Sequence, residues 1–114
     1  MEETIFDQII DGKIPADIVF RNDHVVAFRD INPQAPVHVL VIPLKRMTSI
    51  ADASAVDPET LGHFMQGVAA TARELNLEEK GYRVVFNTGD DALQTVHYVH
   101  AHILGGRRMS WPPG

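Results

Sequence analysis

The sequence contains no cysteine, no long hydrophobic run and no excess of positive charge. Without cysteine, disulfide bonds and cysteine-ligated zinc sites are excluded. The longest apolar stretch, residues 37–44, is interrupted by His38 and is too short to span a bilayer. The formal net charge of −5 argues against a domain that binds nucleic acid, because such a domain needs a basic face to neutralise phosphates. A single nucleotide remains a compatible ligand, since a few local donors can bind it.

The chain has 114 residues, the size of one domain, and 45% of them are hydrophobic, so we expect a packed core. We predict a single domain over residues 1–114. The acidic first residues lack the basic region and apolar core of a signal peptide, which predicts a cytoplasmic protein without membrane association. Several charged or titratable side chains are expected to be solvated: His24, His63 and the pairs 45–46 and 107–108.

Hydrophobic periodicity predicts an α+β fold with a five-stranded, mostly antiparallel sheet. A short amphipathic helix is expected over residues 4–11, with Thr4 as its cap and Gly12 at its end. The main helix should begin at Asp57, which can cap it, with Pro58 in its first turn. Its apolar positions recur at helical spacing and are expected to pack on the sheet: Leu61, Phe64, Met65, Val68, Ala72 and Leu75.

Five segments predict strands, and a turn at Asn22 and Asp23 joins the first two as a hairpin. The third is rich in β-branched residues and predicts a central strand that ends at Pro43. A polar loop over residues 87–94 precedes the last strand. The predicted strands are residues 17–21, 24–30, 37–42, 82–88 and 96–104.

Three of the six histidines, His97, His100 and His102, fall in the last predicted strand. Because side chains alternate across a strand, Tyr98, His100 and His102 are expected on one face and His97 on the other. Adjacent imidazoles are poor core residues, since an unsatisfied buried polar group costs about 1–3 kcal/mol. Two interpretations are therefore open: hydrogen-bonded structural histidines or a catalytic pair.

His38 interrupts an otherwise apolar predicted strand, and the polar segment 87–95 leads directly into the histidines. Backbone N–H groups and small hydroxyls in such a loop can bind an anion. Imidazoles beside anion donors suit phosphoryl chemistry, in which positioning and charge stabilisation supply most of the catalysis. A histidine-bound metal site with His38 as a third ligand is a further alternative.

Residues 94–107 (QTVHYVHAHILGGR) resemble the motif of the histidine triad (HIT) family, in which three histidines alternate with hydrophobic residues. The resemblance extends to residues 30–38 and 41–43, to Ile5-Phe6 and to the C-terminal WPPG, and it covers nearly the whole chain. It is strongest for the Hint branch, whose members are nucleotide-binding phosphoramidases. It implies a HIT-like fold, a homodimer whose sheets join across a two-fold axis, and hydrolysis of purine nucleoside phosphoramidates.

The resemblance also implies a role for individual residues. His100 is expected to be the nucleophile that attacks the α-phosphorus and carries a transient nucleotidyl group. His102 and His38 would contact the phosphate region and assist charge and proton transfer. Asp30 would bind the ribose hydroxyls of a purine nucleotide such as AMP or GMP, and no cofactor or metal is required. The expected phosphate-binding residues are Asn87, Gln94 and Thr95, and the expected nucleobase pocket, whose members are also ordinary core candidates, comprises Ile5, Phe6, Ile9, Phe28, Ile31 and Leu40.

Two positions depart from the family pattern. Tyr98 stands where the first histidine of the triad is expected, and His97 cannot replace it because a one-residue offset points its side chain to the other face. Tyrosine can support the site by hydrogen bonding, but its pKa of about 10 makes it a poor proton shuttle. Leu93 stands where related proteins commonly have glycine. These changes leave open an alternative function, a nucleotide-binding or interaction module with weak catalysis.

Overall fold

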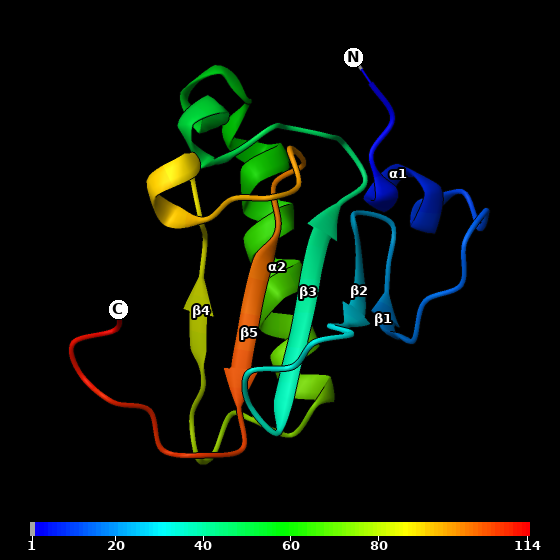
Figure 1. Cartoon of the computed structure of the whole chain (residues 1–114). Coiled ribbons are helices and arrows are strands. Elements are labelled where there is room, and N and C mark those ends of the chain that lie inside the picture. Colours follow the sequence, from blue (N-terminus) through cyan, green and yellow to red (C-terminus); the bar gives the residue numbers. More distant parts are fainter. Residues whose placement is uncertain (1) are drawn as a thin grey trace.

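The computed structural model describes residues 2–114 and contains a five-stranded antiparallel sheet in the order β1-β2-β3-β5-β4 (Figure 1). The predicted α+β class and antiparallel sheet are confirmed, and β3 is the central strand, as expected. Two short 3₁₀ helices, η1 and η2, were not predicted. In chain order the elements are α1 (Ile5–Ile10), β1 (Ile18–Arg21), β2 (Val25–Arg29), β3 (Val37–Pro43), η1 (Ile50–Ala55), α2 (Pro58–Glu74), β4 (Arg83–Val85), η2 (Asp90–Ala92) and β5 (Ala101–Gly105).

Both α-helices begin where their capping residues predict. The Thr4 hydroxyl accepts hydrogen bonds from the N–H groups of Phe6 and Asp7, and the Asp7 carboxylate accepts the Thr4 N–H at 2.7 Å. This reciprocal pair is a capping box, which satisfies N–H groups that a helix start otherwise leaves unpaired. At α2, the Asp57 carboxylate accepts the Thr60 N–H at 3.0 Å.

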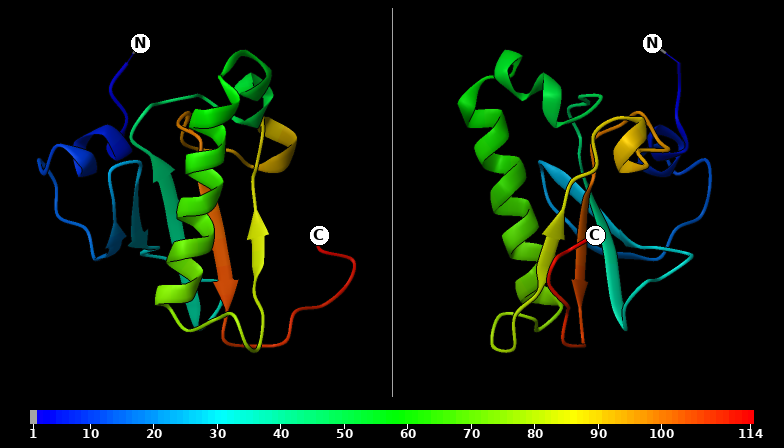
Figure 2. Two further views of the ribbon diagram at one scale, coloured as in Figure 1. Left: turned by 180° about the vertical axis from the view of Figure 1, so that it is seen from behind. Right: turned by 60° about the vertical axis from the view of Figure 1, so that its left-hand side comes forward.

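The sheet separates two apolar layers. Alternate residues of β2, β3 and β5 pack against α2, which lies across one face of the sheet (Figure 2). The intervening residues face a second cluster around α1 on the other side. The histidines of the site lie on this second face, because they alternate with the residues under α2. The second cluster comprises Phe6, Ile9, Val26, Phe28, Leu40, Ile42 and Tyr98.

The prediction of a last strand over residues 96–104 is wrong for residues 96–100, because β5 starts only at Ala101. The pairing between β3 and β5 ends at Val41 opposite Ala101, and Pro43, which has no N–H group, closes β3 soon after. Residues 96–100 are instead bonded to the segment that follows β3; for example, the Val99 N–H donates to the Met47 carbonyl at 2.7 Å.

Two further predictions need correction. The predicted strand 82–88 is shorter, because only Arg83–Val85 pairs with β5. Met65 of α2 was expected to pack on the sheet, but its side chain is 48% exposed. The buried face of that helix is therefore narrower than its apolar periodicity indicates.

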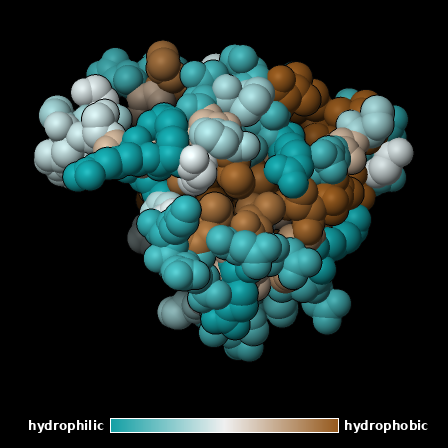
Figure 3. Space-filling model, turned by 90° about the horizontal axis from the view of Figure 1, so that it is seen from below, coloured by the Kyte–Doolittle hydropathy of each residue, from teal (hydrophilic) through white to brown (hydrophobic). Residues whose placement is uncertain are grey.

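Apolar surface remains on the outside of the molecule. The face seen from below in Figure 3 has apolar residues at its centre and hydrophilic residues around them. Contiguous apolar surface of this kind commonly marks a binding site. No helix within residues 2–114 is both long and apolar enough to cross a membrane. The large apolar side chains that are exposed include Ile5, Ile18, Ile31, Leu93 and Trp111.

The approach of α2 to β2 depends on a glycine, which generates a first prediction. A Cβ on buried Gly67 would lie 2.5 Å from Cγ1 of Val25, whereas a Cβ on Gly62 of the same helix would meet nothing within 4 Å. We expect Gly67→Ala to destabilise the fold by about 1–3 kcal/mol through overpacking, and Gly62→Ala to stabilise it by up to about 1 kcal/mol through helix propensity. Urea unfolding measures both; equal effects at the two positions would contradict the close packing.

Candidate active site

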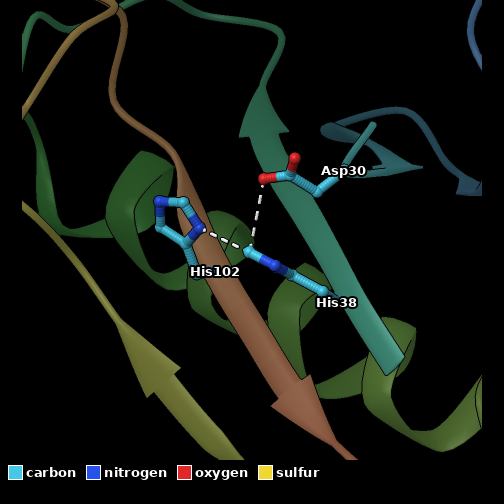
Figure 4. A group of neighbouring side chains, drawn as sticks. All are labelled: Asp30, His38 and His102. Carbon is cyan, nitrogen blue, oxygen red and sulfur yellow. Dashed lines mark hydrogen bonds and ion pairs between the residues drawn. The ribbon is translucent and has the colours of Figure 1, made fainter. Parts of the chain in front are cut away.

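His38 and His102 are brought together by the register of β3 and β5. Leu40 lies opposite His102 and His38 lies opposite Leu104, so the two histidines are diagonal neighbours on the face away from α2. Side chains at diagonal positions of an antiparallel pair are within mutual reach. His38 Nε2 lies 2.9 Å from His102 Nδ1, which makes a direct imidazole–imidazole hydrogen bond (Figure 4).

Asp30 extends this pair from the end of β2. Its N–H donates to the His38 carbonyl, and its carboxylate Oδ2 lies 3.4 Å from His38 Nε2 (Figure 4). The other oxygen, Oδ1, accepts the Asn32 N–H at 2.8 Å. Asp30 therefore starts the turn before Pro33 and also presents a carboxylate to the histidines, so the two interpretations of this residue are compatible.

One backbone donor determines the tautomers of both histidines. His38 Nδ1 accepts the Gln34 N–H at 3.0 Å, so this nitrogen carries a lone pair and a neutral His38 carries its proton on Nε2. That Nε2–H then donates to His102 Nδ1. Because His102 accepts at Nδ1, its own proton lies on Nε2, where it can donate to a ligand.

His100 lies immediately before β5 and is held in the opposite tautomer. Its Nδ1 is 2.7 Å from the backbone carbonyl of Tyr98, and since a carbonyl can only accept, Nδ1 carries the proton. The lone pair of a neutral His100 is therefore on Nε2. The ring centroid lies 5.0 Å from that of Phe6 and 5.0 Å from that of His102, so α1 and β5 flank the imidazole.

The site favours neutral imidazoles. Burial lowers the pKa of His38 and of His100. The negative charge of Asp30 opposes this shift in part at His38, and the hydrogen bond to the Tyr98 carbonyl together with Asp30 opposes it in part at His100. The pKa of His102 falls to about 4, through burial and through the neighbouring charges of His100 and His38. A neutral imidazole retains the lone pair that a nucleophile needs.

The reactive nitrogens are not sealed inside the protein. Among residues 2–114, Arg46 Nε is the only fully buried side-chain nitrogen or oxygen that lacks a hydrogen-bond partner. Nε2 of His100 and Nε2 of His102 have no partner within the described chain, so both are open to solvent. A ligand can therefore reach one lone pair and one N–H at neighbouring positions.

Tyr98 lies on the same side of the sheet as His100 and His102, as the alternation predicts, but its side chain has a different environment. The ring is buried in the second apolar cluster, the hydroxyl donates to the Pro43 carbonyl, and the Arg46 guanidinium lies 5.5 Å from the ring centre. Burial and the charge of Asp7 raise the pKa of Tyr98 above its usual range. The side chain therefore stays protonated, and it is the backbone carbonyl that contacts His100.

A cavity of about 490 Å³ lies between α1 and the sheet beside the histidines. Phe6 borders it and also contacts His100, and Leu40 borders it and pairs with His102. Asp30 contributes to the same wall. The structure thus brings all six expected nucleobase residues to one cavity, although Ile31 is fully exposed at its edge: Ile5, Phe6, Ile9, Phe28, Ile31 and Leu40.

The expected phosphate-binding residues lie in the segment between β4 and β5. Gln94 is buried and its amide is used internally: the oxygen accepts the Gly89 N–H, and the nitrogen donates to the carbonyls of Thr48 and Val96. Asn87 is half-buried and Thr95 is exposed. No hydrogen bond within residues 2–114 joins Asn87 or Thr95 to the three histidines.

Several side chains expected in solvent have structural partners. Arg46 is largely buried, with 18% side-chain exposure, and pairs with Asp7 at 3.1 Å. His24 and His63 stack face to face with ring centroids 3.8 Å apart.

Leu93 is 79% exposed and has a φ of 61°, in the left-handed region where glycine is favoured. A glycine at this position would suit this backbone conformation.

Sequence reasoning missed the backbone groups that set the tautomers and the arginine that anchors the histidine segment. The Gln34 N–H and the Tyr98 carbonyl carry no signal in residue type. Arg46 could have been linked to the site through Asp7, since Thr4 and Asp7 have the spacing of a capping box and leave a carboxylate beside α1.

One group of residues could hold a divalent metal ion. Asp30, His38 and His102 each offer a ligand atom, and these atoms lie within 4.8 Å of one another. In the described structure the two imidazole nitrogens of this set share a proton. A metal ion would have to displace that proton, so metal binding and the hydrogen-bonded state are alternatives.

Comparisons with known proteins agree with this geometry. The HIT domain family matches residues 11–109. A 14 kDa zinc-binding protein of Zea mays is 47% identical, with 97% of this chain and 88% of that protein covered. The crystal structure of a HIT family hydrolase from Legionella pneumophila superposes with a TM-score of 0.91 at 44% identity, covering 98% of this chain and all of that one. A histidine triad nucleotide-binding protein from Candida albicans superposes with a TM-score of 0.80 at 30% identity, covering 96% and 83%. The chain belongs to the HIT domain family.

Proposed function

We propose that this protein hydrolyses purine nucleoside phosphoramidates, or related nucleoside 5′-phosphate derivatives, through a covalent nucleotidyl-histidine intermediate on His100. The observation that carries the proposal is the pairing of two neighbouring imidazoles in complementary tautomers. His100 presents a lone pair at Nε2 and His102 presents an N–H at Nε2. The hydrolase and nucleotide-binding protein among the structural neighbours support this reaction class.

The cavity beside the histidines gives the substrate its orientation. A purine base of AMP or GMP would lie against the apolar wall formed by α1, β2 and β3. Asp30 would accept hydrogen bonds from the ribose hydroxyls, since each of its oxygens retains a lone pair beside its present contact. Phe6 and Leu40 connect this cavity to His100 and His102, so the phosphate would lie at the two imidazoles.

In the first step His100 Nε2 attacks the α-phosphorus, and the bond between phosphorus and the leaving amine nitrogen breaks. The amine leaves readily only when protonated. That proton would be taken up from solvent, and the His102 Nε2–H, oriented by the hydrogen bond between His38 and His102 Nδ1, would donate a hydrogen bond to the phosphoryl group and stabilise the charge that moves during the transfer. Water then attacks the phosphorus of the nucleotidyl-histidine and breaks the bond between phosphorus and His100 Nε2, which releases the nucleoside monophosphate and regenerates neutral His100. The proton that the water loses returns to solvent and balances the one taken up in the first step.

The polar segment before β5 would contact the phosphate oxygens. Asn87 and Thr95 would donate directly, because their side chains are not committed elsewhere within the described structure. Gln94 would act by holding the segment in place, since its amide already bonds to Gly89, Thr48 and Val96.

A nucleotide-binding or interaction module with weak catalysis is the second candidate. The observations that favour it are the side chain of Tyr98, which cannot exchange a proton near neutral pH, and the exposed Leu93 at a left-handed position. Binding of AMP without matching turnover would support it. An assay of both quantities therefore distinguishes the candidates.

The role of His100 generates a direct prediction. We expect His100→Ala to lower kcat for adenosine 5′-phosphoramidate by at least about a thousandfold, as loss of a nucleophile does, while calorimetry still detects AMP binding. His97→Ala is the matched control, because His97 is exposed and lies outside the site. Unchanged turnover in His100→Ala would disprove the covalent route, and loss of activity on chelator treatment would instead indicate a metal at Asp30, His38 and His102.

The pH dependence of the reaction should follow the protonation of His100. Burial lowers the pKa of His100 below the usual 6.5, and the neutral form is the nucleophile. We therefore expect kcat/KM to be constant near neutral pH and to fall only below pH 6.5, as His100 takes up a proton. Initial rates at constant ionic strength measure this profile, and an acid limb centred at or above pH 6.5 would contradict the predicted protonation state.

We also propose the homodimer that the family resemblance implies. β4 is an edge strand of three residues, and Trp111 beyond it is 81% exposed, so the sheet edge and the C-terminal residues are available for a second copy. Sedimentation equilibrium at micromolar concentration should give twice the chain mass of 12.7 kDa, and deletion of residues 111–114 should weaken the association. A mass of 12.7 kDa for the full chain at these concentrations would refute the dimer.

A further inference from the structure

Arg46 connects the two structural parts that flank His100. On one side, its Nη1 donates to the Asp7 carboxylate at 3.1 Å and to the Glu2 carbonyl at 2.7 Å, which binds the start of α1. On the other side, its Nη2 donates to the His97 carbonyl at 3.0 Å. A single guanidinium with two arms can do this because its N–H groups form a rigid fork.

The histidine segment needs such contacts because it has no partner strand. The pairing of β3 and β5 stops at Ala101, and residues 96–100 lie beyond it. Arg46 fixes the peptide between His97 and Tyr98, and the Met47 carbonyl binds the N–H of the next peptide, at Val99. That second peptide also contains the Tyr98 carbonyl, which accepts the His100 Nδ1 proton. Because a peptide unit is planar, fixing its N–H fixes its carbonyl.

Arg46 also contacts the tyrosine that replaces the expected triad histidine. Its guanidinium carbon lies 5.5 Å from the centre of the Tyr98 ring, a cation–π contact in a buried setting. Phe6 of α1 touches both Tyr98 and His100, with ring centroids 6.0 Å and 5.0 Å away. His100 is thus held between a helix that is bonded to Arg46 and a peptide whose immediate neighbour is bonded to Arg46.

We propose that Arg46 is a positioning residue for His100, which it keeps in the nucleophilic tautomer by fixing α1 on one side of the imidazole and, on the other, the His97–Tyr98 peptide that directly precedes the Tyr98 carbonyl. The proposal rests on the proposed function, in which His100 attacks phosphorus. Arg46 touches no reacting atom. Nε of Arg46 is buried and has no hydrogen-bond partner in the described part of the chain, so the position of this side chain is set by the hydrogen bonds of Nη1 and Nη2 and not by contact with water.

The first test separates positioning from binding. In Arg46→Met, which keeps a long apolar side chain, we expect kcat to fall about 10–100-fold, because small displacements of a reacting group have effects of that size. The AMP dissociation constant should change less than about threefold, since neither Arg46 nor any of its hydrogen-bond partners lines the cavity. Arg46→Lys retains one charged donor and should recover part of the loss.

Arg73→Met is the matched control, because Arg73 also forms an ion pair, with Glu78 at 3.1 Å, but lies on the exposed surface of α2. Wild-type kcat is expected there. The proposal is overturned if folded Arg46→Met retains wild-type kcat, or if kcat falls only in proportion to AMP affinity. If Arg46→Met does not fold, Asp7→Asn takes its place; a fall in kcat of about threefold is expected, and unchanged kcat in that folded variant overturns the proposal.

The second test does not depend on catalysis. The ¹⁵N chemical shifts of the His100 ring report which nitrogen carries the proton. In the wild-type protein at pH 7.5 we expect the proton on Nδ1, and in Arg46→Met a shift toward the Nε2 tautomer that an unconstrained imidazole favours. An unchanged Nδ1 tautomer overturns the proposal. If Arg46→Met shows the tautomer shift but the wild-type protein has no hydrolase activity, only the proposed function is rejected.

Discussion

The site depends on the register of β3 against β5. His38 and His102 meet because Leu40 lies opposite His102 and His38 lies opposite Leu104. A slip of one residue would turn one of the two histidines toward α2, into a layer of fully buried apolar side chains. The register is fixed by that same layer, since Val39, Val41, Ala101 and Ile103 alternate with the histidines and cannot be moved to the open face without losing their burial. The core under α2 therefore holds the hydrogen-bonded pair in place.

The end of β3 is equally important, because it determines what the Tyr98 carbonyl can bind. In a regular strand that carbonyl would point to a neighbouring strand and join the ladder. Pro43 closes β3 before the histidine segment reaches it, and residues 96–100 bond to the following loop through Arg46 and Met47 instead. The carbonyl is then available to His100 Nδ1, and the lone pair of His100 is directed to Nε2. An interruption of regular structure thus creates the tautomer in which His100 presents its lone pair at Nε2.

Much of the fold could be predicted from local patterns. Thr4 and Asp57 gave the helix starts, the β-branched run around His38 gave the central strand, and alternation placed His100 and His102 on one face. The start of β5 could not be predicted from residues 96–104, since their alternation continues where the partner strand does not. The contacts of Gln34 and Tyr98 with the imidazoles were also out of reach, because they use backbone atoms that every residue has. The burial of Arg46 was missed because its partner Asp7 is distant in the sequence.

Tyr98 stands in place of the first triad histidine, and its side chain has a structural role in the site. Position 98 lies on the expected face, but its side chain is surrounded by Phe6, Arg46 and the apolar cluster, with its hydroxyl on the Pro43 carbonyl. A histidine here would have to hold an imidazole among these neighbours, and a tyrosine fills the space with an aromatic ring and one satisfied hydroxyl. The contact that orients His100 is made by the backbone of this residue, which is the same for either side chain. Replacement of the first triad histidine therefore alters how the segment is anchored and leaves in place the groups that set the charge and tautomer of His100, because these are the Tyr98 peptide, Asp30 and the burial of the ring.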